Sequence, residues 1–302
     1  MTLQRKMRMI SSTDITWAAA TLTTAARFLE KETITMKRSK IIAILELEGY
    51  QAKKHDVIKN GVIRKGIMLN TGTRANPVFY MDDILCKNDT EENVANRIIA
   101  FYKTSPESPI DPAVLSDRKW VLDHLTIALQ RNSDEAIVKR GTEFHGIEQY
   151  LILMDKNDGG CFSIKVTSPL LKNIGVDETI AWDIAENHIV LSFRLQSLSS
   201  VLGEAFLEDF PGEDKVGLHI VSTENKIKGA AAILHRGALK AFANSHDTNK
   251  LIVIPSSVHE MLILPYDGTQ DIEEFSALVK EVNATQVTPE EQLADQAYII
   301  TV

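Results

Sequence analysis

The sequence predicts an α+β fold, with a small hairpin-containing N-terminal domain followed by a larger domain that has a mostly antiparallel sheet and flanking helices. Asn60-Gly61 separates two stretches of β-forming residues, and this dipeptide favours a type I′ turn because both of its positions accept positive φ. Two apolar runs, Leu251 to Ile254 and Met261 to Leu264, are each followed by a proline. Runs of this length, rich in Ile and Leu, are typical of short buried strands. Capped amphipathic stretches between these strand signals predict the flanking helices.

The first domain is expected to span residues 36–106, because the stretch 105–112 holds three prolines and is typical of a linker. Its two helices are expected to begin at Ser39 and Thr90, whose hydroxyls can accept backbone N–H bonds at a helix start. The first helix should end at Gly49. The first helix is expected to run through Leu47, and the second to be about 12 residues long with Glu91 and Glu92 in its first turn. The inner face of the second helix should carry Val94, Ile98, Phe101 and Tyr102. The predicted strands are Lys54–Lys59, Val62–Leu69 and Asn76–Met81.

The larger domain is expected to span residues 107–302. Asn157-Asp158-Gly159-Gly160 predicts a second hairpin. Thr167 and Ser168 together, and Asp177 further on, have side chains that favour helix starts. Trp120 to Leu129 fits a strand or a helix, and periodicity leaves both open. The other predicted features are the strands Gln149–Asp155, Cys161–Val166, Val216–Ser222 and Tyr298–Val302, the helices Asn132–Lys139, Ser168–Gly175, Glu178–His188 (with Ile180, Trp182 or Ile184, and Ala185 inward), His235–Ala243 and Ile272–Val282, the Ala-rich stretch Gly229–Leu234, and a helical turn at Thr288-Pro289.

Basic residues concentrate at the start of the chain. Residues 1–40 hold eight Lys and Arg against three Asp and Glu, a local charge of +5 in a chain of net charge −8, which leaves −13 for the remaining residues. This shift predicts a separate basic extension over residues 1–35, ahead of Met36. Two interpretations stay open. The segment is either a peripheral extension that the fold does not need or a targeting peptide, although it lacks the apolar core and cleavage site of a secretory signal.

Composition bounds the compartment and the class of partner. With 44% hydrophobic and 25% charged residues, the 302-residue chain is ordinary for a soluble globular protein, and no apolar run approaches the roughly 20 residues of a membrane-spanning helix. Cys86 and Cys161 form no CxxC pair, which favours a reducing cytoplasm over a disulfide framework. The negative charge disfavours direct nucleic-acid binding, which depends on Lys and Arg at phosphates. We expect instead a protein partner with a basic surface.

Five segments give the chain a resemblance to a family of proteins from anaerobic gut bacteria that is known only as a domain of unknown function. The most specific segment is Ile254-Pro-Ser-Ser-Val-His-Glu260, which carries a Pro-Ser-Ser-x-His-Glu motif. The resemblance covers residues 36–302. It implies a shared fold and a bacterial cytoplasmic context, and it implies no activity. The other four segments are Lys59–Ile67, Asn76–Asp83, Lys228–Leu234 and Val282–Leu293.

The polar residues between the two apolar runs are the best candidate site. Ser256, Ser257, His259 and Glu260 would be held between two buried strands, where a rigid scaffold can position reactive side chains. A hydrolase interpretation makes Ser256 or Ser257 the nucleophile and His259 its base. However, the chain lacks the Gly-x-Ser-x-Gly element of many serine hydrolases. Residues so close in sequence also seldom align as donor and acceptor.

A metal site is an alternative interpretation of the same residues. His259-Glu260 would need a second histidine at position 263, which is Ile263, to complete a His-Glu-x-x-His helix. The flanking apolar runs also predict a strand, in which successive side chains point to opposite faces. Further ligands would have to come from elsewhere in the chain, and the candidates are His219, His235 and His246. We expect no metal and no other cofactor.

A structural interpretation assigns the candidate side chains to hydrogen bonds. The serine hydroxyls would satisfy backbone groups in a buried turn, while His259 and Glu260 would bond across the sheet. Replacing either of these two residues by alanine should then lower stability, because an unsatisfied buried partner costs about 1 to 3 kcal/mol. In the first domain, Asp82-Asp83 is a weaker candidate for a divalent cation. Such a pair more often caps the next element and stays solvated.

The sequence therefore leaves two classes of function. The first is an intracellular protein-binding accessory or counter-defence factor whose acidic body meets a basic protein surface. Electrostatic complementarity would speed such an association and make it sensitive to salt. The second is a hydrolase with its site at the turn from Pro255 to Glu260. The absence of a complete catalytic motif favours the binding class.

Overall fold

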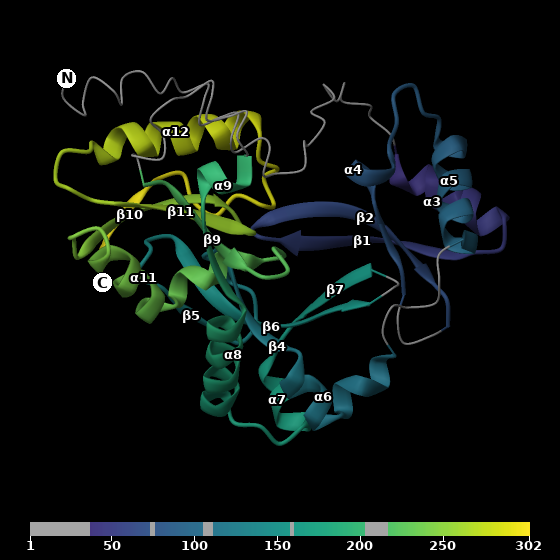
Figure 1. The fold of residues 1–302 in the computed structure, drawn as a ribbon. Helices are drawn as coiled ribbons and strands as arrows, with labels where there is room; N and C mark the ends of the chain where they lie inside the picture. The colour runs from purple at the N-terminus through teal and green to yellow at the C-terminus, as the bar shows by residue number, and fades with distance from the viewer. Residues whose placement is uncertain (1–36, 73–75, 105–110, 158–159, 203–216) are drawn as a thin grey trace. The chain divides into compact units, whose positions relative to one another are not determined.

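Three mostly antiparallel sheets and the helices beside them make up the described part of the chain, which confirms the predicted α+β class (Figure 1). The computed structural model describes residues 37–72, 76–104, 111–157, 160–202 and 217–302. These residues divide into two compact units. Among them, the N-terminal unit comprises residues 37–117 and Asp155–Phe162, and the C-terminal unit comprises Arg118–Met154 and Ser163–Val302.

Some predictions fall on residues outside the described part. The basic extension over residues 1–35 is one of them, and most of the proline-rich linker, residues 105–110, is another. The expected domain boundary at residue 106 therefore stays a prediction. The loop residues Asp158 and Gly159 of the second hairpin also lie outside. Among the described residues, no helix combines the length and apolar character needed to cross a lipid bilayer.

The N-terminal unit packs helices on a three-stranded sheet. Its elements are α3 (Arg38–Leu47), β1 (Gln51–Lys59), β2 (Val62–Asn70), β3 (Val78–Tyr80), α4 (Met81–Ile84), α5 (Glu91–Thr104) and the 3-10 helix η1 (Pro112–Ser116). The sheet has the order β1-β2-β3, and its core joins buried residues of α3, β2 and α5. Asn60 and Gly61 connect β1 to β2 with φ angles of 50° and 78°. The predicted type I′ hairpin is therefore confirmed.

One of the two predicted caps in this unit is confirmed. Thr90 Oγ1 accepts the backbone N–H of Asn93 at 3.2 Å, as expected at the start of α5. Ser39 does not cap α3, because the helix already begins at Arg38 and its N-cap residue, Lys37, makes no side-chain bond.

The inner face of α5 and the third strand differ in part from the prediction. Two of the four predicted residues of α5 are buried, but Phe101 is 49% exposed. Ala95 and Ile99 are buried instead, so the buried face of the helix is rotated by about one residue. The third strand, β3, is shorter than predicted, because Met81 already begins α4.

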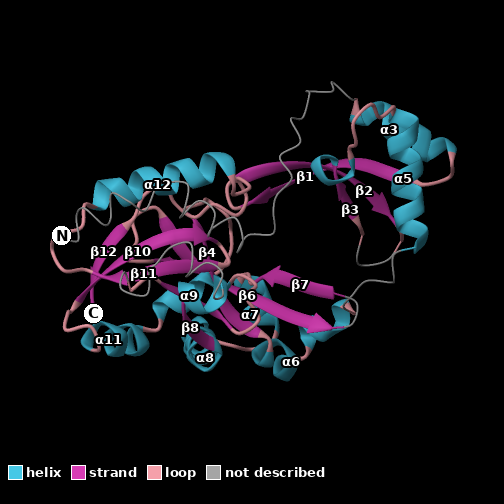
Figure 2. Cartoon of the chain, turned by 45° about the horizontal axis from the view of Figure 1, so that its top comes forward, coloured by secondary structure: helices cyan, strands magenta, loops and turns pink. Residues whose placement is uncertain are grey.

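The C-terminal unit holds two sheets (Figure 2). Its elements are α6 (Arg118–Asp123), β4 (Leu125–Arg131), β5 (Lys139–Gly141), β6 (Ile147–Asn157), β7 (Gly160–Lys165), α7 (Ser168–Asn173), α8 (Glu178–Ser192), β8 (Phe193–Ser197), α9 (Leu198–Leu202), β9 (His219–Thr223), the 3-10 helix η3 (Gly229–Leu234), α11 (Arg236–Asn244), β10 (Lys250–Ser257), β11 (Glu260–Pro265), α12 (Ile272–Thr285) and β12 (Tyr298–Thr301). The larger sheet has the order β12-β10-β11-β9-β8, with every neighbouring pair antiparallel. The other sheet has the order β4-β6-β5, and β7 pairs with β6 as the second predicted hairpin. The described residues within Asp155–Phe162, at the end of β6 and the start of β7, are grouped with the N-terminal unit.

The two apolar runs form the central strands of the larger sheet, as predicted. Ile252 and Leu264 pack with Phe275 of α12 in one core cluster, while Leu251 and Ile263 on the other face are equally buried. Figures 1 and 2 show α12 on one side of this sheet and α8 and α11 on the other. Burial on both faces explains why β10 and β11 are continuous apolar runs rather than alternating ones. Each fully buried Leu or Ile side chain contributes about 1.5 to 3 kcal/mol to stability.

Local signals place two helices of this unit correctly, but one predicted helix is wrong. Thr167 and Asp177 each accept a backbone N–H bond at the start of α7 and α8. Asn132 to Lys139 forms no helix, since residues 132–138 are a loop that leads into β5. The side chains of this loop bond to strand residues instead. Ser133 Oγ, for example, donates to Glu148 Oε1 at 2.8 Å.

The segment that the sequence leaves open, from Trp120 to Leu129, contains both kinds of structure. Helix α6 ends at Asp123 and strand β4 begins at Leu125.

The inner face of α8 agrees with the prediction in part. Trp182 is buried, whereas Ile180 is 47% exposed.

Candidate functional site at the β10–β11 turn

The candidate polar residues lie where β10 turns into β11. Ser256 and Ser257 end β10, Val258 and His259 form the turn, and Glu260 begins β11. The pairing register shifts at Ser256, so the two strands are irregular next to the turn. Both serines and Glu260 are buried, and His259 is half-buried. The four candidate side chains therefore lie together at one end of the two central strands.

The two serine hydroxyls are bonded within the turn. Ser257 Oγ accepts the backbone N–H of His259 at 3.1 Å. Ser256 Oγ donates to Glu260 Oε1 at 3.3 Å. A serine nucleophile needs its hydroxyl beside the nitrogen of a base. The bond from Ser256 directs its proton to Glu260, and Ser257 Oγ takes a backbone N–H, so neither bond is made to the ring of His259.

Three segments that are distant in the sequence bond to the turn. The backbone N–H of Lys228 donates to His259 Nδ1 at 3.1 Å. Ser222 Oγ donates to the carbonyl oxygen of His259 at 2.8 Å. The backbone N–H of Val258 donates to the carbonyl oxygen of Glu291 at 2.8 Å. The turn is thus fixed by β9, by the residue before η3 and by the segment that leads to β12.

Gly229 approaches this turn too closely for any side chain. A Cβ atom at this position would lie 2.3 Å from Ser222 Oγ, 2.7 Å from the backbone nitrogen of Thr223 and 2.8 Å from the carbonyl oxygen of His259. Two of these atoms belong to the backbone, so they cannot give way without moving β9 or the turn. Glycine is therefore required where η3 begins.

Both ring nitrogens of His259 have partners. Nδ1 accepts the N–H of Lys228, and Nε2 lies 3.5 Å from Glu291 Oε1. An accepting Nδ1 places the proton of the neutral ring on Nε2, facing the carboxylate. The hydrogen bond from His259 is the main cause that holds the pKa of Glu291 below its ordinary value, against the opposing effect of burial. His259 therefore has no free lone pair with which to deprotonate a serine.

A cavity of about 620 Å³ lies beside the turn and is lined largely by residues of β8, β9 and the loop before η3. Glu260 lines this cavity and is only 8% exposed. Burial raises the pKa of Glu260 above its ordinary value, although the bond from Ser256 and the charges of His259 and Lys226 oppose the shift. A buried carboxyl group with a perturbed pKa at a cavity is typical of functional sites. The other titratable residues that line the cavity are Arg194, Glu224, Lys226, His259 and Glu291.

The family of this chain follows from a match over most of its length. The family model described as Family of unknown function (DUF5688) matches residues 31–300. The chain belongs to this family. The description assigns no activity to the family, and comparisons with curated proteins and with solved structures found no match. Membership in a family of unknown function is thus confirmed, whereas the bacterial origin and the family motif stay predictions.

Three of the five segments that carry the resemblance meet at the turn of this family member. Segment 254–260 forms the turn, segment 228–234 supplies the N–H that bonds to the ring of His259, and segment 282–293 supplies Glu291. The sequence places these segments far apart, so only the fold shows that they build one site.

The other two segments meet in the N-terminal unit, around Arg64. Arg64 Nη2 lies 2.6 Å from Asp83 Oδ1, and Arg64 Nε lies 3.5 Å from Asp82 Oδ2. The guanidinium group also lies over the ring of Tyr80, at 4.9 Å from its centroid. Both acidic side chains therefore pair with an arginine, which argues against Asp82-Asp83 as a cation site.

The histidines considered as further metal ligands pack on aromatic rings in the C-terminal unit. The rings of His219 and His246 lie 4.7 and 4.4 Å from that of Phe242. The ring of His235 lies 5.0 Å from that of Phe193. In the part of the chain that the structure describes, no three His, Cys, Asp or Glu side chains form a group that could hold a metal ion.

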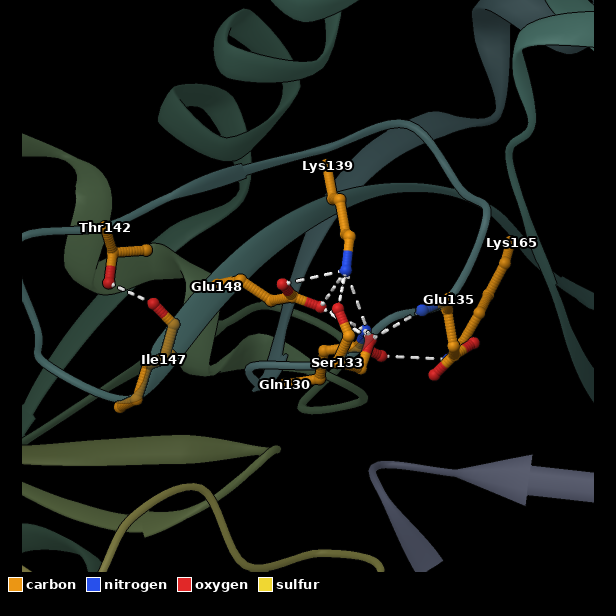
Figure 3. A network of polar contacts seen from close by, with 8 residues as sticks. All are labelled: Gln130, Ser133, Glu135, Lys139, Thr142, Ile147, Glu148 and Lys165. Atoms are coloured by element: carbon orange, nitrogen blue, oxygen red, sulfur yellow. Dashed lines mark hydrogen bonds and ion pairs between the residues drawn. The ribbon is translucent and has the colours of Figure 1, made fainter.

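A polar network on the β4–β6 sheet is a feature that the sequence reasoning missed (Figure 3). Glu148 accepts from Gln130 Nε2 at 2.7 Å and from Ser133 Oγ at 2.8 Å, and Lys139 Nζ lies 3.1 Å from its other oxygen. The only signal in the sequence is that Gln130 and Glu148 are polar residues next to apolar strand segments.

The same network contains a second pair of opposite charges. Lys165 Nζ lies 2.5 Å from Glu135 Oε2 and donates to Gln130 Oε1 at 2.9 Å. It also lies over the ring of Tyr150, at 5.1 Å from the centroid. Because the two lysines and two glutamates pair with one another, the network fits a role in holding the loop after β4 against the sheet.

A second cavity, of about 700 Å³, lies along α12 and β12. Several polar groups that line it are paired with each other. Arg131 Nη2 lies 3.1 Å from Asp295 Oδ1, and the hydroxyl of Tyr298 donates to the carbonyl oxygen of His145 at 2.7 Å. The cavity beside Glu260 is the better candidate for a ligand site, because the buried carboxyl group of Glu260 accepts one hydrogen bond from the described residues, that of Ser256.

Proposed function

We propose that this protein is a protein-binding accessory factor, with counter-defence as one such role, that takes a basic segment of another protein on its acidic C-terminal region. Residues 118–302 contain 27 Asp and Glu against 16 Lys and Arg, a formal charge of −11. The same count gives +3 for residues 1–117. Opposite charges across an interface speed association and suppress wrong partners. The charge of the C-terminal region therefore suits a basic segment.

The engagement of His259 is the observation that carries this proposal. Its ring nitrogens face Lys228 and Glu291, and the hydroxyls of Ser256 and Ser257 are bonded within the turn. These described side chains form no nucleophile with an adjacent free base. The cavity beside them offers the carboxyl group of Glu260 to a ligand. This arrangement supports binding rather than covalent catalysis.

Equilibrium binding of charged peptides tests the proposal. Labelled deca-lysine should bind the full chain, and deca-glutamate of the same length should not. Raising the salt concentration from about 0.1 M to about 1 M shortens the screening length from about 10 Å to about 3 Å. The affinity for deca-lysine should therefore fall at least about tenfold. Equal binding of both peptides, or binding that salt leaves unchanged, would contradict the proposal.

A hydrolase with its site at the turn from Pro255 to Glu260 is the second candidate, and the raised pKa of Glu260 favours it. A carboxyl group that keeps its proton to higher pH is suited to act as a general acid. Ester, peptide and glycoside substrates should be screened with the parent and with Glu260→Gln as the matched variant. Turnover that this substitution abolishes would replace the binding proposal. Equal turnover by both proteins would point to a contaminant.

A further inference from the structure

Glu260 offers one carboxyl oxygen to the cavity beside the β10–β11 turn. Its Oε1 accepts the hydroxyl of Ser256 at 3.3 Å. Its Oε2 has no protein hydrogen bond within the described residues and is not a fully buried atom, so it is open to the cavity. An ionised carboxylate in a buried position is costly unless a positive charge reaches it. The charges of Lys226 and His259 already act on this carboxyl group, so the open oxygen points to a further cationic partner.

The other charged groups that line this cavity balance each other. Arg194 Nη2 lies 2.9 Å from Glu224 Oε2. Lys226 and Glu291 add one charge of each sign. An ionised Glu260 would give the cavity a charge of −1, which a single positive charge on a ligand would neutralise.

We infer that the cavity takes a lysine side chain of the basic partner, with Glu260 Oε2 as the acceptor for its ammonium group; this inference rests on the proposed function. A guanidinium group is matched by both oxygens of a carboxylate in two parallel bonds. The hydroxyl of Ser256 already takes one acceptor position of Oε1, whereas both positions of Oε2 are open, so a donor that acts singly is the better match. An ammonium group is a compact charge whose donors act singly. The volume of about 620 Å³ lies within the roughly 300 to 1,000 Å³ of typical ligand pockets.

Binding of an ammonium group here is coupled to the loss of a proton. Burial raises the pKa of Glu260, so the free protein keeps this carboxyl group protonated to higher pH than an ordinary glutamate. A lysine side chain must displace that proton to gain its counter-ion. Its affinity should therefore rise as pH rises through the raised pKa and level off above it. The charged and titratable groups that line the cavity with Glu260 are Arg194, Glu224, Lys226, His259 and Glu291.

A comparison of two polycations isolates the ammonium group. Deca-lysine and deca-arginine carry the same charge and differ in the head group, so the ratio of their affinities removes the long-range charge effect. Fluorescence anisotropy at fixed salt should show that Glu260→Gln weakens deca-lysine about tenfold and deca-arginine less, because one charge-assisted hydrogen bond is lost. Glu224→Gln removes the same charge from an exposed side chain of the same cavity. It should leave the ratio of affinities unchanged.

Ser256→Ala gives a second, positive test. Removing the hydroxyl frees Oε1, so Glu260 can meet a guanidinium group with both oxygens and the ratio should shift toward deca-arginine. The pH dependence needs no variant, since both peptides stay charged below about pH 10. In the parent, the affinity for deca-lysine relative to deca-arginine should rise with pH.

The possible outcomes separate the two proposals. If neither peptide binds the parent, the proposed function fails, and the inference fails with it. If both peptides bind in a salt-sensitive way but the ratio is the same in the parent and in Glu260→Gln, only the lysine site is overturned. If the ratio of the affinities of the parent for deca-lysine and deca-arginine does not change from pH 5 to pH 9, the lysine site is overturned too. This measurement needs no variant, so it decides the question even if a variant fails to fold.

Discussion

Glu148 and Glu260 are only 7% and 8% exposed, but their pKa values move in opposite directions from that of an ordinary glutamate. Burial acts to raise the pKa of Glu148, and hydrogen bonds from three side chains, Lys139 among them, outweigh it and hold the pKa below its ordinary value. Glu260 receives one such bond, from Ser256, so burial dominates and raises its pKa. Three side-chain donors oppose the effect of burial at Glu148, whereas one side-chain donor opposes it at Glu260.

This contrast separates a structural carboxyl group from one that is available to a ligand. The partners of Glu148 are complete, and a ligand could reach this residue only by breaking existing bonds. The partners of Glu260 are incomplete, and the open oxygen lies at a cavity. Burial alone would have marked both residues as candidates. The set of bonded donors tells them apart.

Removing Glu148 should have the largest effect. Glu148→Ala leaves Lys139 and Gln130 without their shared acceptor, and breaking a buried ion pair costs about 3 to 5 kcal/mol in the free energy of unfolding. We expect the lower end of this range, because the side chain of Lys139 is 22% exposed. Urea denaturation measures the loss. The control Glu186→Ala breaks an exposed pair with Arg140 and should cost less than about 1 kcal/mol. Equal losses for the two variants would show that Glu148 contributes no more to stability than an exposed ion pair.

Gly229→Ala tests the packing of the turn that carries Glu260. The added Cβ atom would lie 2.7 Å from the nitrogen of Thr223 and 2.8 Å from the carbonyl oxygen of His259. Shifting these backbone atoms should cost about 1 to 3 kcal/mol. Gly141→Ala is the matched control, because a Cβ atom there would meet nothing within 4 Å. Equal melting temperatures for the two variants would show that the turn adjusts freely to an added methyl group. The surroundings of Glu260 would then not be fixed, and its contrast with Glu148 would not hold.

The smallest effect, with the opposite sign, is expected for Glu260→Gln. Glutamine keeps the shape of the side chain and removes the cost of ionising a buried group. Because the folded pKa of Glu260 is raised, the parent loses stability as pH rises from the unfolded pKa, about 4.3, through the folded value. Above that range the variant should be more stable than the parent, as urea denaturation at neutral pH would show. Below about pH 4 the two proteins should match.

Glu148 should show the reverse dependence on pH. Its folded pKa is lowered, so its contribution to stability is present above the unfolded pKa and disappears as pH falls through the folded value. Melting curves of Glu148→Gln and Glu260→Gln between pH 3 and pH 9 should therefore diverge from that of the parent in opposite directions as pH rises. Parallel profiles for the two variants would show that the two carboxyl groups do not differ.

Signals that act within a few residues predict most of the fold. Asn60-Gly61 fixes a hairpin through its own φ angles, and Thr90 caps α5 through a hydrogen bond to a residue three positions later. Prediction fails where a distant partner competes. The stretch from Asn132 to Lys139 has a helical composition, yet Ser133 bonds to Glu148, 15 residues away, and the stretch forms a loop.

The candidate site is predictable only in part, for the same reason. His259 and Glu260 can be singled out by residue type, because they are polar residues between two apolar runs. Lys228 and Glu291 cannot, since they reach His259 only after the residue before η3 and the segment before β12 have packed on the turn. The state of the His259 ring depends on both of these contacts. It therefore follows from the fold and not from the motif.

The two-residue turn at Val258 and His259 also bears on the order in which the sheet assembles. β10 and β11 are adjacent in the chain, and the entropy cost of closing a loop grows with its length. A hairpin of this kind forms within about 1 to 10 μs, whereas β9 and β12 must pair across longer stretches of chain. We therefore expect substitutions in the turn to slow refolding and substitutions in β12 to speed unfolding, as stopped-flow kinetics would show. The cavity would then close last, when β9 brings β8 to a hairpin that is already formed.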